Sequence, residues 1–551
     1  MKTPADIRIP TTLGFGLILL YLWPVITQPG SLALGASCGP APELMWQMWS
    51  VGTAESTHLG FPGPPPSTLL DAPIMALVFV ALKAILGNAL VAWNTGIGLG
   101  FLVLLLGTLD LVHRLSPNSP MLARLTMVIA VVAAPGWSPV VGHLGMAAVP
   151  MMCVPLAISI LDRWIQPHAG KGFGVLACVL TIVACSGHWT TTVFVLAILI
   201  PMAVIQCRNI EGRQAWLRAL WVVSPGLLGG AILVGINAAP GNGINLSPES
   251  LGPEWIYQLE GALQLPATAV VALPGLGMLL LVLAGVAARP VRTVGWLLVG
   301  AWGILLAAGL GADGFEAFAP AHQLASRVPV LNHLGSWWGI APLVSIPLGI
   351  TAMYGVEALH KVRRERLAAA VLAVALIDQV LPTLTAPGAH AFRLNPSQGV
   401  QTALSNLPDG AVLQLPSAAD GCTTHQLWQR SHGRAMSTPH RTGQDGGQQV
   451  SYMARLITRQ MQTPGVQASA ESPIDPATFI CASGDIGTLQ DLGFGAVVLD
   501  QTTGSPPVVA NTLRLVLGEP IFEDERAAVW SLDGLQAADF TSPCPLPSRP
   551  G

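Results

Sequence analysis

Two carboxylates in the polar segment after the first apolar stretch are the groups best suited to chemistry. Glu43 begins the run ELMWQMW, whose apolar residues recur at helical spacing, so an amphipathic helix is predicted over residues 42–54. A carboxylate in the first turn of a helix is stabilised by the helix N-terminus. The same position suits a general base that takes a proton from an acceptor hydroxyl. Asp71 is the second carboxylate and lies at the end of the segment.

Histidines and one arginine could bind the rest of a substrate. His143 and His188 are expected in short turns at the ends of apolar stretches, and His58 follows Glu43 in the same polar segment. Arg327 carries the planar, forked donor group that suits a phosphate, and an ion pair with an acidic residue of its own loop is the alternative. The candidate substrate-binding residues are His58, His143, His188, His322, Arg327 and His333.

A metal ion is a weaker alternative for the same residues. Glu43, His143 and His188 could ligate a divalent metal, but no spacing such as HxxxH supports a metal site. We therefore assign no metal ligands, and a divalent metal ion as cofactor is left open.

The composition indicates what must position these residues. Of the 551 residues, 52% are hydrophobic and only 10% are charged, against about 25% charged in an ordinary soluble domain. A water-soluble enzyme is thereby disfavoured, and a polytopic membrane protein is favoured. The net charge of −3 also argues against nucleic acid as a partner, because such binding depends on basic surfaces.

The apolar stretches predict about eleven transmembrane helices in residues 1–387, since a bilayer core needs about 20 apolar residues per helix. The stretch at 73–87 is shorter and contains Lys83, so we interpret it as a helix in the membrane interface, as we do residues 42–54, with Trp46 and Trp49 at headgroup depth. The predicted spans are 11–28, 88–112, 121–138, 145–161, 171–186, 189–206, 219–238, 267–287, 293–312, 338–356 and 367–384.

The distribution of positive charge predicts the orientation of these spans. With eleven spans and a cytoplasmic N-terminus, 15 Lys and Arg fall on the inner side of residues 1–387, and only Lys83 and Arg327 fall on the outer side. Cytoplasmic loops are enriched in positive residues. We therefore predict an integral inner (plasma) membrane protein with outer loop 29–72 and an extracytoplasmic C-terminal part.

Residues 388–551 are predicted to form a small soluble α/β domain. Short β-rich runs lie at 411–416, 494–499 and 527–532, a helix is expected at 451–461, and loops are expected at 438–449 and 463–476. Cys422 and Cys481 would face an oxidising compartment, so they form either a disulfide or two buried thiols. SHGR at 431–434 with Asp445 lacks the sequence context of a catalytic triad, and we interpret this domain as a lid or docking module.

The order of these parts resembles the GT-C class of integral-membrane glycosyltransferases, and more closely a family of large bacterial membrane proteins of that architecture. The resemblance implies a GT-C-like helical fold, a polyprenyl-phosphate-linked sugar and membrane lipid as partners, and a catalytic carboxylate at Glu43 with a second acidic position, also a catalytic candidate, at Asp71. The motifs that carry it are ELMWQMW at 43–49, STLLDAP at 67–73, GNALVAWN at 87–94, GHL at 142–144, SRVP at 326–329, LQLP at 413–416, SHGR at 431–434 and LGFGAVVL at 492–499.

One departure from the class keeps other functions open. GT-C enzymes commonly carry an Asp or a pair of acids in this loop, whereas Glu43 is flanked by Pro42 and Leu44. The chain is therefore an inverting glycosyltransferase with a single Glu base, or a non-catalytic scaffold that binds envelope proteins. A lipid or solute transporter is a further alternative, but it should show internal repeats, and the sequence shows no convincing one. Asp378, inside the last predicted span, requires a buried partner, a wet cavity or access to the membrane surface.

Overall fold

The computed structural model divides into two compact units. The first comprises Met1–Ala36, Gln47–Val51 and Leu69–Phe392, and the second comprises Ser37–Trp46, Gly52–Thr68 and Arg393–Gly551. We call them the membrane unit and the outer unit. Two pieces of the first loop thus belong with the C-terminal part of the chain. The structure describes residues 5–35, 41–51, 59, 71–208, 210, 212–237, 275–308, 327, 338–385, 391–393, 398–415, 424–437, 489–501, 510, 511, 513, 514 and 517–533.

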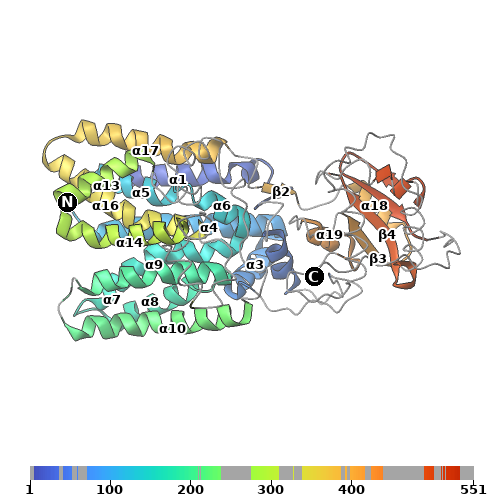
Figure 1. The fold of residues 1–551 in the computed structure, drawn as a ribbon, viewed down its shortest axis with the longest axis horizontal. Helices are drawn as coiled ribbons and strands as arrows, with labels where there is room; N and C mark the ends of the chain where they lie inside the picture. Colours follow the sequence, from blue (N-terminus) through green and yellow to red (C-terminus); the bar gives the residue numbers. More distant parts are fainter. Residues whose placement is uncertain are drawn as a thin grey trace. The chain divides into compact units, whose positions relative to one another are not determined.

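The membrane unit is a bundle of long apolar helices that run roughly alongside one another (Figure 1). Helix α4 packs on α7 and α3, while α16 packs on α5, α13 and α14. Its helices are α1 (Ala5–Thr27), α3 (Pro73–Leu86), α4 (Ala89–Leu115), α5 (Met121–Val132), α6 (Trp137–Leu144), the 3-10 helix η1 (Gly145–Cys153), α7 (Val154–Ile165), α8 (Lys171–Ala184), α9 (Trp189–Arg208), α10 (Arg213–Asn237), α13 (Leu276–Ala288), α14 (Pro290–Ala308), the 3-10 helix η5 (Trp338–Ile340), α16 (Ala341–Lys361) and α17 (Glu365–Thr385).

Every predicted span overlaps a described helix, with residues 238, 267–274 and 309–312 of three spans outside the described residues, and the number of membrane crossings remains a prediction. Seven described helical segments are long and apolar enough to cross a membrane, and three shorter apolar helices accompany them. Helix α3 has 14 residues, about 21 Å at 1.5 Å per residue, which is shorter than a bilayer core of about 30 Å. Helices α8 and α13, which lie within predicted spans, are similarly short, so the interfacial position of the helix at 73–87 stays a prediction.

The stretch from 121 to 165 differs from the two simple spans predicted there. Helix α5 ends at Val132, and α6, η1 and α7 follow it. The most apolar window of this stretch is 94% buried inside the protein. Hydropathy alone could not separate a lipid-facing helix from this interior one, because both are uniformly apolar.

Asp378 on α17 has a partner inside the membrane unit. Its carboxylate Oδ2 accepts a hydrogen bond of 3.1 Å from the backbone N–H of Gly277, in the first turn of α13. The N-terminus of a helix carries unpaired N–H groups and a partial positive charge, both of which stabilise a carboxylate. Asp378 therefore caps α13, which explains how this carboxylate is tolerated on the apolar helix α17.

The outer unit is built on a four-stranded mixed sheet in the order β3-β4-β6-β5. Strand β3 (Ala411–Leu415) pairs in parallel with β4 (Phe494–Asp500), while β6 (Ala527–Ser531) pairs antiparallel with both β4 and β5 (Phe522–Glu523). Helices α18 (Gln398–Ser405) and α19 (Thr424–His432) complete its described elements. The three predicted strands are confirmed. The predicted helix at 451–461, both predicted loops, Cys422 and Cys481 lie outside the described residues.

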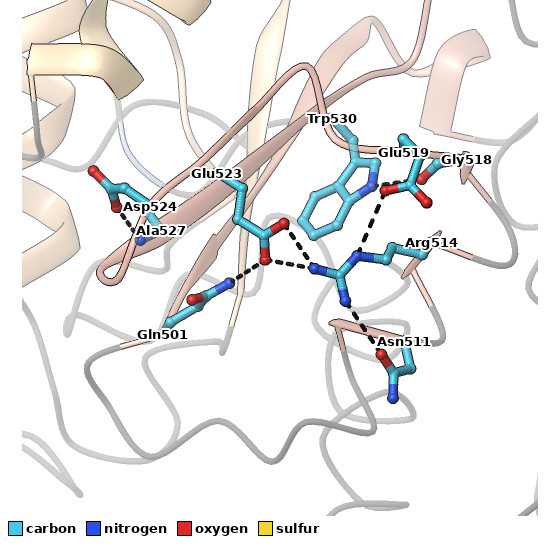
Figure 2. A network of polar contacts seen from close by, with 9 residues as sticks. All are labelled: Gln501, Asn511, Arg514, Gly518, Glu519, Glu523, Asp524, Ala527 and Trp530. Atoms are coloured by element: carbon cyan, nitrogen blue, oxygen red, sulfur yellow. Dashed lines mark hydrogen bonds and ion pairs between the residues drawn. The ribbon is translucent and has the colours of Figure 1, made fainter. Parts of the chain in front are cut away.

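A buried core and a peripheral ion-pair network stabilise this sheet. Val497, Leu499 and Trp530 belong to one apolar cluster. At the periphery, Arg514 Nη2 donates to both carboxylate oxygens of Glu523, at 2.6 and 2.7 Å, which attaches the segment before β5 to that strand (Figure 2). The pair with Arg514 also lowers the pKa of Glu523 below its ordinary value.

SHGR at 431–434 ends helix α19 and is a structural motif. Gly433 adopts a positive φ of 70° and donates its N–H to the carbonyl of Gln429 at 2.8 Å, as is typical at a helix C-terminus. Arg434 donates to the carbonyls of Leu404, Leu407 and Pro408 at 2.6–2.7 Å. The arginine thereby satisfies acceptors at the end of α18 and attaches α19 to it.

Candidate active site

Strand β1 (Leu32–Leu34), which begins the outer loop, is held by two residues of the GNALVAWN motif. Asn94 Oδ1 accepts from the backbone N–H of Leu34 at 2.9 Å, and Asn94 Nδ2 donates to the carbonyl of Leu32 at 2.8 Å. Trp93 Nε1 donates to the carbonyl of Leu34 at 2.8 Å. On its other edge β1 pairs with β2 (Ala391–Arg393). Helix α4 therefore fixes the direction in which the chain enters the loop that carries Glu43.

Glu43 lies in the first turn of helix α2 (Ala41–Ser50), as predicted from its sequence, and its residue is only 1% exposed. The surrounding helix differs from the prediction. Met45 is fully buried and Trp46 is 5% exposed, so the placement of Trp46 at headgroup depth is wrong. The amphipathic pattern marked contact with protein, because burial in a protein core and burial in a lipid interface require the same apolar face.

Trp46 contacts helix α19 within the outer unit. Its indole Nε1 donates a 2.8 Å hydrogen bond to Oε1 of Gln429, in a buried position. The guanidinium carbon of Arg430 lies 5.8 Å from the centre of the Trp46 ring, within the range of a cation–π contact. Gln429 is 383 residues from Trp46 in the sequence. No local sequence pattern relates residues so far apart, so neither Gln429 nor Arg430 could be predicted as a partner of Trp46.

Asp71 and His188, from two different candidate sets, come together in the membrane unit. Asp71 Oδ2 lies 3.7 Å from Nε2 of His188, whose side chain is 1% exposed, whereas that of Asp71 is 19% exposed. Asp71 stands just before α3, and His188 stands just before α9. Both side chains therefore extend from chain segments at helix N-termini.

The imidazole of His188 is held by the start of α9. Its Nδ1 lies 2.7 Å from Oγ1 of Thr190 and 3.4 Å from the Thr190 backbone N–H. In the tautomer whose Nδ1 accepts from this N–H, Nε2 carries the proton and faces Asp71. Gly187 permits the tight turn, since a Cβ there would lie 2.8 Å from the carbonyl oxygen of Ala147. In this state both imidazole nitrogens are already directed at protein groups, so the Asp71 carboxylate is the member of the pair that can accept a hydrogen bond from a hydroxyl group.

Of the other candidates, the structure describes His143 and Arg327. His143 is buried on α6, with 3% exposure. Arg327 is described as a single exposed residue. His58, His322 and His333 lie outside the described residues.

The structure shows no group of three or more His, Cys, Asp or Glu side chains arranged to hold a metal ion, within the part of the chain that it describes. Glu43 and the two histidines proposed as alternative ligands belong to different compact units, Glu43 to the outer unit and His143 and His188 to the membrane unit. We therefore base no chemistry on a metal ion.

Comparison with solved structures identifies the fold. The chain superposes on the arabinofuranosyltransferase AftD from mycobacteria with a TM-score of 0.54 and 15% identity, over 98% of this chain and 40% of that one. A mutant of AftD gives a TM-score of 0.54 and 16% identity over 96% and 42%. The oligosaccharyltransferase of Archaeoglobus fulgidus is matched at a TM-score of 0.45 and 14% identity, over 92% and 69%.

Sequence-level comparisons add no further assignment. No protein-family model matches the chain, and no curated protein matches it. The chain spans about two fifths of the length of AftD. The likeness nevertheless covers both the helical bundle and the outer unit. The chain therefore has the fold of the GT-C membrane glycosyltransferases, as its motifs predicted.

Proposed function

We propose that this protein transfers a sugar from a polyprenyl-phosphate carrier to an acceptor on the extracytoplasmic side of the plasma membrane. The observation that carries the proposal is the match to AftD over nearly the whole chain. Because AftD is an arabinofuranosyltransferase, a polyprenyl-phosphate-linked arabinofuranose is the first donor to test.

The proposed mechanism is a single displacement with inversion. The acceptor hydroxyl oxygen attacks the anomeric carbon of the sugar, the bond from that carbon to the carrier phosphate oxygen breaks, and polyprenyl phosphate leaves. Glu43 takes the proton of the hydroxyl as general base. Asp71 and His188, 3.7 Å apart, orient the sugar or the acceptor, and Arg327 holds the phosphate of the carrier.

The burial of Glu43 adds a requirement to this mechanism. A general base must come within about 3 Å of the proton that it abstracts, yet Glu43 is only 1% exposed. The acceptor must therefore displace the groups that cover this carboxylate. We expect a closed resting state that opens when donor or acceptor binds, as many enzymes with loop-covered sites do.

The test is transfer of radiolabelled sugar by purified protein in lipid nanodiscs, with polyprenyl-phosphate donors that include arabinofuranose. Glu43→Gln should lower turnover about 100-fold or more, because Gln cannot accept the proton. Asp71→Asn should lower it to a smaller extent. Two matched controls make the same changes at exposed carboxylates of the outer unit, Glu525→Gln and Asp409→Asn, and should keep full activity.

The outcomes separate the candidate functions. Wild-type activity that survives Glu43→Gln would reject Glu43 as the base while leaving the glycosyltransferase in place. A folded wild type that transfers no sugar from any donor would favour the non-catalytic scaffold. Topology is tested separately: a periplasm-active reporter fused after residue 388 should be active, and a fusion active only in the cytoplasm would contradict the predicted orientation.

A further inference from the structure

The outer unit contains both the first half of helix α2 and the C-terminal domain. This grouping joins the segment that carries the proposed base to a sheet that begins about 370 residues later. The outer unit is thus composed of two distant parts of the sequence, and the loop is one of its structural components.

Contacts at two places attach the loop to the domain. The first is the buried hydrogen bond of 2.8 Å from Trp46 to Gln429, with Arg430 beside the Trp46 ring. The second is a parallel bridge between Leu59 and Met436, which in turn bridges to Val412 of β3. Leu59 is 1% exposed. The loop therefore extends the sheet beyond β3 at its edge and contacts α19 through its helix.

The position of Trp46 on α2 relates this attachment to the proposed chemistry. Residues three apart on a helix are neighbours on one face, so Trp46 and Glu43 share a face of α2. Trp46 and Gln429 are 5% and 0% exposed, and a buried donor that loses its acceptor strongly favours rearrangement. Any shift of the helix that breaks the bond to Gln429 would also move the carboxylate of Glu43.

We infer that Gln429, with Arg430 beside it, is a positioning residue that sets the placement of Glu43 through Trp46. This inference rests on the proposed function. Gln429 touches neither substrate nor reacting atoms, and it acts by fixing the indole of Trp46. In this inference the C-terminal domain holds the helix that carries the base.

The experiment is a double-mutant cycle in the full-length protein in nanodiscs. Gln429→Met keeps the side-chain length and removes the acceptor, and Trp46→Phe keeps an aromatic ring and removes the donor. Each should lower kcat about tenfold with the donor KM unchanged within twofold, since a misplacement of about 1 Å can cost up to 100-fold. The double variant should be no slower than the slower single variant, because both changes remove one bond.

Hydrogen–deuterium exchange and two matched controls separate positioning from stability. The amides of residues 43–46 should exchange faster in both single variants. Gln501→Leu and Trp530→Phe remove side-chain hydrogen bonds elsewhere in the outer unit, an exposed one to Glu523 and a partly buried one to the Gly518 carbonyl (Figure 2). Both variants should leave kcat and the exchange of α2 unchanged.

Three results would overturn the inference. If the wild type is active and both single variants match its kcat, Gln429 does not position the base, although the proposed function stands. If the double variant loses the product of the two single losses, the residues act independently. If the wild type transfers no sugar, the proposed function fails and takes the positioning role with it, while faster exchange in the variants would still report the attachment of α2 to α19.

Discussion

Substitution of Asn94 by Ala should release strand β1, the entry to the outer loop. The change removes the hydrogen bonds to Leu34 N–H and Leu32 C=O, at 2.9 and 2.8 Å. Leu34 is 1% exposed, so its amide would lose its acceptor in a position that water does not reach. The variant therefore tests whether one side-chain amide holds the loop in place.

The magnitude follows from the cost of leaving buried polar groups unsatisfied. Each such group costs about 1–3 kcal/mol, so two groups together amount to about 3 kcal/mol when the strand stays in place. A tenfold change in an equilibrium constant corresponds to about 1.4 kcal/mol. Local opening of β1 should thus become on the order of 100-fold more frequent.

Hydrogen–deuterium exchange of the Leu34 amide in nanodiscs measures this opening directly. Asn88→Ala is the matched control, because Asn88 caps the same helix by accepting from the N–H groups of Leu90 and Val91. Its loss should cost about 1 kcal/mol at the start of α4 without changing the exchange of Leu34. An increase of less than threefold in Asn94→Ala, or an equal increase in both variants, would refute the role assigned to Asn94.

The remaining predictions concern the outer unit. Arg434→Met should destabilise it by about 2–3 kcal/mol, since several hydrogen bonds to carbonyls are lost. Hydrogen–deuterium exchange of the β3 amides measures the loss, and the same change at the exposed Arg526 is the control. A loss of stability below about 0.5 kcal/mol would contradict the prediction. Burial and the Arg434 cation lower the pKa of His432 from 6.5 to about 4. As the pH falls, the imidazole of His432 is protonated in the unfolded chain at a higher pH than in the folded protein. The free energy of unfolding should therefore hold above pH 6.5 and fall as the pH drops towards 4. His432→Gln should flatten the decline between pH 6.5 and 5, and an unchanged slope would reject this cause.

The sequence by itself determined the elements whose cause is local. A window of about 20 apolar residues is sufficient to mark a membrane helix, and each predicted span overlaps a described helix. Alternating or β-branched runs between turn residues marked the strands at 411–415, 494–500 and 527–531. Glu43 in the first turn of a helix was also predictable, because helix N-termini favour acidic residues. The motifs further indicated the GT-C fold.

Only the tertiary structure decided which of these elements meet. Asp71 and His188 are 117 residues apart, yet they approach to 3.7 Å. The apolar face of α2 was assigned to the membrane interface, whereas the structure buries Trp46 against Gln429. Hydropathy measures how strongly a side chain avoids water, and it is equal for burial in lipid and in protein. The partner is set by the path of the whole chain, which brings together side chains that no local pattern relates.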